Sequence, residues 1–407
     1  MPEAVIVAAA RSPIGRALKG SLVELRPDDM AVQIVRAALD QVPQLDPKEI
    51  VDLHLGCAEP YDEHGGNMAR RVAVQLGFDT LPGTTVNRYC ASSLQTTRMA
   101  MHAIRAGEGH AFIAAGVECI SRYSDPSAPG AVPDQYKNPI FRSAIERNEE
   151  IVAANRPWTD PRTDGGLPDV YLMMGQTAEN VATASGISRE EQDRFAVRSQ
   201  QRAEAAIADG FFAREITPLT LPDGSQVATD DGPRPGTTYE KVAALKPAFR
   251  AGGTVTAANA CPLNDGAAAL VVMSDERAAE LGIEPLARIV ATGVSGLSPE
   301  IMGLGPIEAT RQALSHAGMT IDDLDLIEIN EAFAVQVIAS ARELAIDEDK
   351  LNVHGGAIAL GHPFGMTGAR IATTLINGLR SRDGELGLET MCVGGGQGMA
   401  MILERLS

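Results

Sequence analysis

A strand–helix–strand pattern occurs twice in this chain, and this duplication constrains the fold more than any other feature of the sequence. The two copies open with apolar, strand-sized runs at 4–10 and 286–293. Three residues of the first helical pattern recur 275 positions later in the second, as the pairs Arg36 and Arg311, Ala38 and Ala313, and Leu39 and Leu314. Strand-like runs follow at 50–57 and 324–330. This alternation predicts an α/β fold with helices on both faces of the sheet, built from two similar halves.

Between the halves, residues 122–250 have a different character. Their first part is rich in Pro, Gly and Asp, which is typical of loops. A helix follows, because Ser188 and Glu191 form a capping-box pattern and Gly210 stands where a helix would stop. We therefore predict an N-terminal domain over 1–276 that includes the inserted segment 122–250 as a lid over a ligand, and a C-terminal domain over 277–407.

The charge of the chain argues against one class of partner. Lys and Arg number 35 against 53 Asp and Glu, a net charge of −18. Nonspecific nucleic-acid binding requires a basic surface, so we do not expect it. A small anionic ligand is compatible with a local basic patch. Residues 234–250 supply such a patch through Arg234, Lys241, Lys246 and Arg250, although an ordinary solvated loop would have the same composition.

The cysteines and the N-terminus indicate the compartment. The five cysteines are scattered and include no CxxC pair, so they predict neither a disulfide framework nor a zinc site. No positive residue precedes the first apolar run, and no run of about 18 apolar residues exists, so we expect no signal peptide and no membrane-spanning helix. The sequence predicts a cytoplasmic protein with reduced thiols.

Cys90 stands in "VNRYCASSLQ" (86–95), at a corner between a strand-like run and a helical pattern. A helix N-terminus lowers the pKa of a cysteine thiol, and the backbone N–H groups there can hold an oxyanion. The small residues after Cys90 leave the sulfur accessible. These features suggest a nucleophile, whereas a lone cysteine is otherwise most often a buried structural residue.

Three further segments carry residues suited to catalysis. His362 lies in the glycine-rich "HGGAIALGHPFGMTGAR" (354–370), before a proline that restricts its backbone, and it could take a proton from a cysteine. Cys392 ends a strand-like run and meets "GGGQG", whose backbone can present N–H donors. Asn330 follows a strand in "EINEAFA", where it could orient a water or simply cap a helix. Each segment alone is also compatible with a purely structural role.

Taken in order, seven segments resemble the thiolase family, and the resemblance runs from residue 9 to residue 404. The segments are "VNRYCASSLQ" (86–95), "GVECISR" (116–122), "MGQTAEN" (174–180), "GTVTAANACPLNDGAAA" (253–269), "NEAF" (330–333), "GGAIALGHPFGMTGAR" (355–370) and "CVGGGQG" (392–398). The resemblance implies a duplicated αβαβα layered core with an inserted loop domain that binds coenzyme A. It also implies a homodimer or homotetramer, acyl-CoA and CoA as ligands, and neither a metal nor another cofactor.

The resemblance also implies a role for each matched residue. Cys90 would be the acylated nucleophile, His362 its activator, and Cys392 the acid/base at the substrate alpha carbon. Asn330 would hold a water that stabilises an enolate together with His362, and the N–H groups of Cys90 and Gly394 would form a second oxyanion hole. The positions expected to contact the substrate or CoA are Arg234, Lys241, Ala257, Cys261, Met173, Met174, Met302 and Phe333.

Two departures from the family pattern bear on the substrate. Cys261 stands where many thiolases have a serine that contacts pantetheine. Met173 stands where short-chain members tend to have histidine, and a flexible apolar side chain suits a longer or bulkier acyl group. We therefore expect a degradative 3-ketoacyl-CoA thiolase of fatty-acid or lipid breakdown. The alternatives are a biosynthetic acetoacetyl-CoA thiolase and a noncatalytic acyl-CoA-binding relative.

Overall fold

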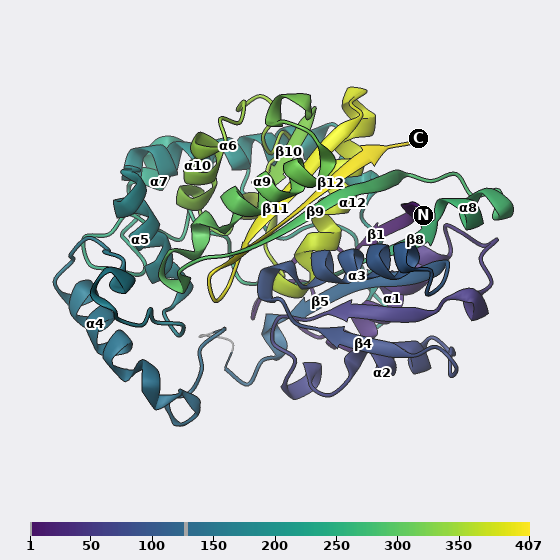
Figure 1. Ribbon diagram of the computed structural model, residues 1–407, viewed down its shortest axis with the longest axis horizontal. Helices are drawn as coiled ribbons and strands as arrows, with labels where there is room; N and C mark the ends of the chain where they lie inside the picture. Colours follow the sequence, from purple (N-terminus) through teal and green to yellow (C-terminus); the bar gives the residue numbers. More distant parts are fainter. Residues whose placement is uncertain (1, 126–128) are drawn as a thin grey trace.

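The computed structural model describes residues 2–125 and 129–407, so residues 126–128 of the predicted insertion lie outside the described chain. One sheet passes through both halves in the order β10-β11-β12-β9-β1-β8-β5-β3-β4 (Figure 1). The strands of the first half are β1 (Ala4–Arg11), β2 (Gly15–Arg16), β3 (Asp52–Gly56), β4 (Gly83–Val86), β5 (Ala111–Cys119) and β8 (Asn264–Ser274). Those of the second half are β9 (Ala287–Gly296), β10 (Leu326–Ile329), β11 (Leu386–Val393) and β12 (Gln397–Arg405).

The strand order confirms the duplication. Counted outward from the centre, the first half runs β1, β8, β5, β3 and the second runs β9, β12, β11, β10. Equivalent pairs have the same direction: β3–β5 and β10–β11 are parallel, whereas β5–β8 and β11–β12 are antiparallel. Within the sheet, the described strands of the two halves are paired through two residue pairs of β1 and β9. Each half therefore behaves as a separate layer joined at one corner.

Helices cover both faces of each half. The first half has α1 (Pro27–Leu39), α2 (Met68–Gln75) and α3 (Ser92–Ala106), and the second has α9 (Gly305–Ala317), α10 (Ala334–Glu343), α11 (Ala357–Leu360) and α12 (Thr367–Arg382). Helices α3 and α12 pack against each other and against strands of both halves, so they form a middle layer. Helices α1 and α2 cover one outer face, and α9 and α10 cover the other. The result is the predicted αβαβα arrangement.

The strands are apolar along their whole length because both of their faces are covered. In β1, Ala4 and Ile6 face the middle layer, whereas Val5 and Val7 face the outer helices. The helices show the repeat as well. Buried Ile34, Val35 and Ala38 of α1 correspond, 275 positions later, to three buried residues of α9: Ala309, Thr310 and Ala313. The offset read from the sequence therefore superimposes the core-facing sides of the two helices.

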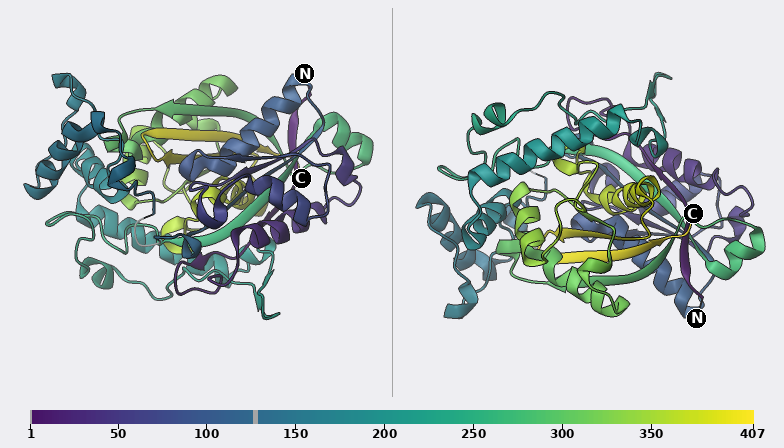
Figure 2. Two further views of the ribbon diagram at one scale, coloured as in Figure 1. Left: turned by 90° about the horizontal axis from the view of Figure 1, so that it is seen from below. Right: turned by 90° about the horizontal axis from the view of Figure 1, so that it is seen from above.

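The inserted segment 122–250 contains more helix than its composition predicts. Its elements are α4 (Arg142–Ala153), α5 (Met174–Ser185), α6 (Arg189–Ala208), the short strands β6 (Leu219–Thr220) and β7 (Gln226–Val227), and α7 (Tyr239–Ala243). The capping box of Ser188 and Glu191 is present at the start of α6, as predicted. Apolar side chains of α5 and α6 join the core clusters, whereas α4 projects at the end of the molecule opposite both termini (Figure 2).

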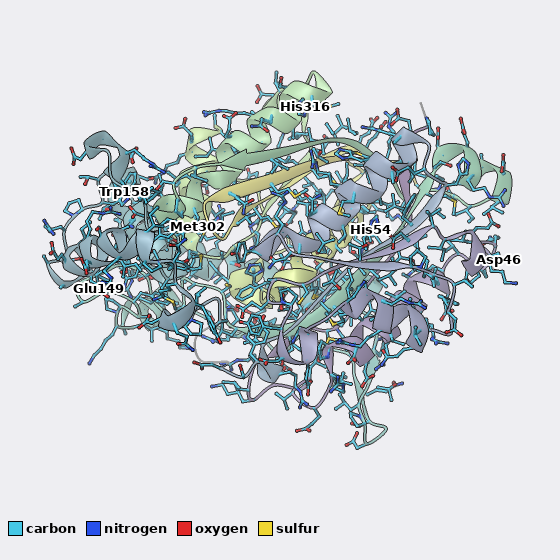
Figure 3. The ribbon with its side chains drawn as sticks, turned by 60° about the horizontal axis from the view of Figure 1, so that its bottom comes forward. Asp46, His54, Glu149, Trp158, Met302 and His316 are labelled. Atoms are coloured by element: carbon cyan, nitrogen blue, oxygen red, sulfur yellow. The ribbon has the colours of Figure 1, made fainter. Side chains whose placement is uncertain are left out.

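One buried carboxylate fastens this segment to the second half. Glu300 accepts hydrogen bonds from Trp158 Nε1 at 2.7 Å and from Asn148 Nδ2 at 2.8 Å, and it pairs with Arg147. Trp158 and Met302 consequently lie at the same end of the molecule as α4 (Figure 3). The remaining connection between the halves is α8 (Asp275–Leu281), which spans the predicted boundary at 276/277. Within the described residues, no helix is both long and apolar enough to cross a membrane.

Candidate active site

The turn that carries Cys90 is a tight, strained corner. A short 3-10 turn over Tyr89–Ala91 leads directly into α3, as the sequence predicts. Tyr89 has a φ of +44°, a left-handed conformation that costs a tyrosine free energy and is therefore notable beside a reactive residue. A Cβ added to Gly394 would lie 3.1 Å from Tyr89 Cγ, so the strained residue packs its ring on the glycine turn of the other half.

Close packing of small residues brings the histidine loop to this corner. A Cβ added to Gly116, near the end of β5, would lie 2.0 Å from Gly365 O and 2.6 Å from Ser93 Cβ. Only glycine permits this approach. The 3-10 turn that carries Cys90 therefore packs against the turn Phe364–Met366, which follows His362, and against the end of β11. The turn that carries Cys90, the turn that follows His362 and the strand that carries Cys392 thus lie together, although they are far apart in the sequence.

Hydrogen bonds determine the tautomer of His362. The Thr367 hydroxyl donates to Pro363 O at 2.8 Å, so its oxygen can only accept from His362 Nδ1, which lies 2.6 Å away. Nδ1 therefore carries the proton, and Nε2 presents a lone pair. Asn330 Nδ2 lies 3.3 Å from this Nε2 atom, and Asn330 Oδ1 is buried without a partner among the described residues. The ring is thus oriented as a proton acceptor.

Burial favours the uncharged forms of both Cys90 and His362. Burial raises the pKa of the Cys90 thiol to about 12, although the backbone N–H groups of Gly394 and of Cys90 itself face the sulfur and act in the opposite direction. The pKa of Cys90 is therefore raised instead of lowered as the helix N-terminus suggests, because desolvation outweighs the backbone N–H groups. Burial also lowers the pKa of His362 to about 3, and the Arg370 charge acts in the same direction.

Cys392 occupies the last part of β11, before the turn of Gly394 and two further glycines. Its side chain is 0% exposed, and its thiol donates a hydrogen bond to Gln336 Oε1 with a sulfur–oxygen distance of 2.9 Å. Burial raises the pKa of Cys392 well above the ordinary value, and the nearby Cys90 and Cys261 thiols act in the same direction. Three cysteines therefore share the site, of which Cys90 and Cys261 are partly exposed.

Apolar residues from the insertion and the second half surround Cys392. Met302 and Phe333 are buried in one cluster with Cys392, and Met174 packs against that cluster. Met173, at the start of α5, is 43% exposed instead. Asn330 does not cap α10, since the residue that precedes this helix is Phe333. The structural alternative that the sequence left open for Asn330 therefore does not hold.

Three of the predicted CoA contacts lie together, whereas one residue of the predicted basic patch lies elsewhere. Arg234, Lys241 and Ala257 line one cavity of about 310 Å³, together with Arg16 from the first half and Pro262, which follows Cys261 in the chain. Arg250 belongs elsewhere, because it is buried and donates to Gln176 Oε1 and Asn180 Oδ1, each at 3.0 Å. Arg250 is therefore not part of the basic patch expected over 234–250. Its hydrogen bonds to Gln176 and Asn180 stabilise the fold instead.

Sequence reasoning missed several supporting residues. Thr367 fixes the tautomer of the His362 ring, and Asn264 Oδ1 accepts a hydrogen bond from the backbone N–H of His362 at 3.0 Å. Both lie within the quoted motifs, in "GMTG" and "PLNDG", so attention to hydroxyl and amide groups there would have identified them as candidates. Gln336 and Arg16 had no such signal, since each becomes part of the site only through tertiary contacts. Among the described residues, no group of three or more His, Cys, Asp or Glu side chains is arranged to hold a metal ion.

Comparison with known proteins agrees with this geometry. Residues 4–276 match the family model "Thiolase, N-terminal domain", and residues 283–405 match "Thiolase, C-terminal domain". The chain is 44% identical to the 3-oxoadipyl-CoA/3-oxo-5,6-dehydrosuberyl-CoA thiolase of Escherichia coli (strain K12), over 100% of both chains. It is 42% identical to the 3-ketoacyl-CoA thiolase of Bacillus subtilis (strain 168), over 99% of this chain and 100% of that one.

A solved structure shows the same fold. The crystal structure of the Bacillus anthracis acetyl-CoA acetyltransferase superimposes with a TM-score of 0.86 and 39% sequence identity, over 100% of this chain and 99% of that one. The duplicated layers and the two family models agree with the resemblance seen in the sequence. The chain belongs to the thiolase family and is an acyltransferase.

Proposed function

We propose that this acyltransferase cleaves 3-ketoacyl-CoA with coenzyme A, in the degradative direction, through an acyl group carried on Cys90. The observation that carries the proposal is the packing of the Cys90 turn against the turn that follows His362 and against β11, which carries Cys392. A noncatalytic acyl-CoA-binding relative would not need a histidine with a fixed tautomer beside a partly exposed thiol. The observed arrangement therefore favours an enzyme.

The first step of the proposed reaction is acyl transfer to sulfur. His362 Nε2 accepts the Cys90 proton as the sulfur attacks, so charge separates only during the reaction. The N–H groups of Cys90 and Gly394, which face the sulfur, lie where an oxyanion would form at the attacked carbonyl. A positioned oxyanion donor typically contributes about 3 kcal/mol to the lowering of a barrier.

Acyl transfer from a 3-ketoacyl-CoA breaks the bond between its ketone carbon and its alpha carbon, so acetyl-CoA leaves as an enolate. The thiol of free CoA then takes the acyl group from Cys90, and condensation is the reverse of these steps. Cys392 gives a proton to the departing enolate in thiolysis and removes one from acetyl-CoA in condensation. Asn330, with its unpartnered Oδ1 and its Nδ2 beside His362, is suited to hold a water against the enolate oxygen. Arg16, Arg234 and Lys241 give the adjoining cavity the positive charge that the phosphates of CoA require.

The substrate class follows from the side chains around Cys392. Methionine and phenylalanine form that wall, which suits an apolar acyl chain longer than acetoacetyl. Several relatives are named for a dicarboxylic substrate, 3-oxoadipyl-CoA or beta-ketoadipyl-CoA, so the terminal carboxylate must be tested directly.

The decisive experiment is thiolysis of three substrates by the purified protein: acetoacetyl-CoA, a medium-chain 3-ketoacyl-CoA and 3-oxoadipyl-CoA. We expect the medium-chain substrate to have the highest kcat/KM. A preference for acetoacetyl-CoA would favour the biosynthetic alternative, and a preference for 3-oxoadipyl-CoA would replace the apolar chain with a dicarboxylic one. Thiolysis of none of them, with CoA still bound, would support the noncatalytic alternative.

Met173 offers a test of chain-length selection within the same assay. Replacing Met173 with histidine introduces a polar ring in place of a flexible apolar side chain. We expect Met173→His to reduce medium-chain turnover about threefold or more relative to acetoacetyl-CoA turnover, because the loss concerns apolar contact with the longer chain. Equal effects on both substrates would exclude Met173 as a determinant of specificity.

A further inference from the structure

Gln336 is a buried amide whose one polar contact, among the described residues, is with the Cys392 thiol. It lies in the first turn of α10, with a side chain that is 0% exposed. Its Oε1 atom accepts the Cys392 S–H at a sulfur–oxygen distance of 2.9 Å. Its Nε2 atom is buried and has no hydrogen-bond partner within the described part of the chain. Within the described chain, the amide therefore has a hydrogen bond at its oxygen but none at its nitrogen.

The surroundings make such an amide unfavourable for packing. Val335, Ala339 and Cys392 belong to the same apolar cluster, and a Cβ added to Gly303 would lie 2.8 Å from Gln336 Cβ. A buried N–H group without a partner destabilises a folded protein, so methionine, of equal length, would pack there at lower cost. An amide that is retained against this cost points to a role in the chemistry of its partner.

Cys392 must exist in two protonation states if it exchanges a proton with the alpha carbon. When the C–H bond of acetyl-CoA breaks, the proton forms the S–H bond of Cys392 and the electron pair stays on the thioester as an enolate. In thiolysis the S–H bond breaks, the proton joins the enolate carbon and a thiolate remains. A thiol needs an acceptor beside it, whereas a thiolate needs a donor.

We propose that Gln336 is a positioning residue for Cys392 and that its amide serves both states. Beside the thiol, Oε1 accepts the S–H proton, as the structure shows. Beside the thiolate, a half-turn of the terminal amide brings Nε2–H to the sulfur as a donor, and this torsion has a broad, nearly two-fold preference. The unpartnered Nε2 atom is thus available to donate a hydrogen bond to the Cys392 thiolate when that state forms. This inference rests on the proposed function of Cys392.

The other described groups that act on Cys392 supply one backbone donor. Cys90 and Cys261 are the titratable neighbours, and both disfavour a negative charge on its sulfur. The N–H of Cys392 itself is the single backbone group that favours the thiolate among those acting on it. Gln336 Nε2–H would therefore add a side-chain amide donor to this backbone donor.

Two variants separate the positioning role from simple packing. Gln336→Met keeps the length but removes both the acceptor and the donor. We expect solvent deuterium exchange into the methyl group of acetyl-CoA, and condensation, to fall by about ten- to a hundredfold. Acetylation of Cys90 by labelled acetyl-CoA should stay within about threefold of wild type, because that step involves no C–H bond. The matched control is Ser340→Ala, a buried residue one turn further along α10, which should change neither activity.

Gln336→Glu supplies the sharper readout and remains decisive if Gln336→Met fails to fold. A neutral carboxyl group has both an acceptor and a donor, whereas a carboxylate has acceptors only. Deuterium exchange by Gln336→Glu should therefore approach the wild-type rate at low pH and fall as pH rises, with a decline absent from wild type. A purely structural role predicts no new pH dependence. A pH profile parallel to wild type, or Gln336→Met exchange equal to Ser340→Ala, would overturn the inference.

The same measurements distinguish this inference from the proposed function. Wild-type protein must show thiolysis and deuterium exchange in every series. If it shows both and the Gln336 variants behave as Ser340→Ala does, only the role of Gln336 is lost. If wild type shows neither, the proposed function fails, and the inference about Gln336 fails with it.

Discussion

Cys90 and Cys392 reach one site from opposite halves of the molecule, but the two halves hold them differently. Cys90 is partly exposed at a turn, and backbone N–H groups face its sulfur. Cys392 is fully buried at the end of a strand, and a side-chain amide holds its thiol. Rigid backbone donors suit a carbonyl oxygen whose charge appears at one place. A rotatable amide suits a sulfur that alternates between thiol and thiolate.

The largest expected effect comes from removing the first cysteine. Cys90→Ala should abolish acetylation by acetyl-CoA, condensation and thiolysis together, because all three require the acyl carrier. Incorporation of label from acetyl-CoA, followed by peptide mapping, measures the first activity. Cys119→Ala, a buried cysteine at the end of β5, is the control and should keep all three. Label that remains on Cys90→Ala protein would assign the nucleophile to another residue.

Removing the second cysteine should separate the two steps. Cys392→Ala should still be acetylated, whereas condensation and thiolysis fall by about two to four orders of magnitude, the usual contribution of a positioned acid or base. Cys261→Ala is the matched control, since this third thiol lies in the same site and should leave condensation largely intact. If Cys261→Ala lost condensation and Cys392→Ala retained it, the two assignments would have to be exchanged.

The next effect concerns the base that serves Cys90. Thr367→Val keeps the shape but removes the acceptor of His362 Nδ1–H, so the proton is no longer fixed on that nitrogen. We expect Cys90 acetylation to slow by about tenfold or more, below the full contribution of a general base. Thr373→Val is the control, because that hydroxyl also donates to a carbonyl four residues earlier but does not touch His362. Equal rates for both variants would contradict the tautomer assigned here.

The smallest effect tests the electrostatics around Cys90 through pH. Burial raises the pKa of Glu59 to about 8, and the Glu118 carboxylate acts in the same direction. Below pH 8 Glu59 is mostly neutral, whereas above it a negative charge forms that further disfavours the Cys90 thiolate. Glu59→Gln should therefore match wild type in Cys90 alkylation by iodoacetamide at pH 7 and exceed it about two- to fivefold at pH 9.

Two results would contradict the prediction for Glu59→Gln. A rate difference already present at pH 7 would mean that Glu59 is ionised there, and no difference at pH 9 would mean that its charge does not reach Cys90. Peptide mapping identifies the labelled thiol in each case. The exposed fractions favour Cys90 and Cys261 over the three buried cysteines as sites of labelling.

Much of the fold could be predicted because the buried strands are visible in the sequence as short apolar runs. The runs at 4–10, 111–118 and 286–293 are apolar throughout, as strands covered on both faces must be, and they became β1, β5 and β9. The duplication could be predicted because equivalent helices of the two halves bury equivalent faces, so similar residues recur at one offset in the sequence. The helices α4 and α5 were harder to predict, since the Pro- and Gly-rich stretches between them are typical of loops and their packing partners lie in the second half.

The sequence by itself determined which groups the site contains: two cysteines, a histidine and an asparagine, each in a motif whose residue types suit the chemistry. Tertiary structure alone decided their states. The pKa values of Cys90 and His362 moved apart because burial disfavours charge on both, which no local pattern reports. The partner of Cys392 likewise depends on where α10 packs, so Gln336 became part of the site only when the chain folded.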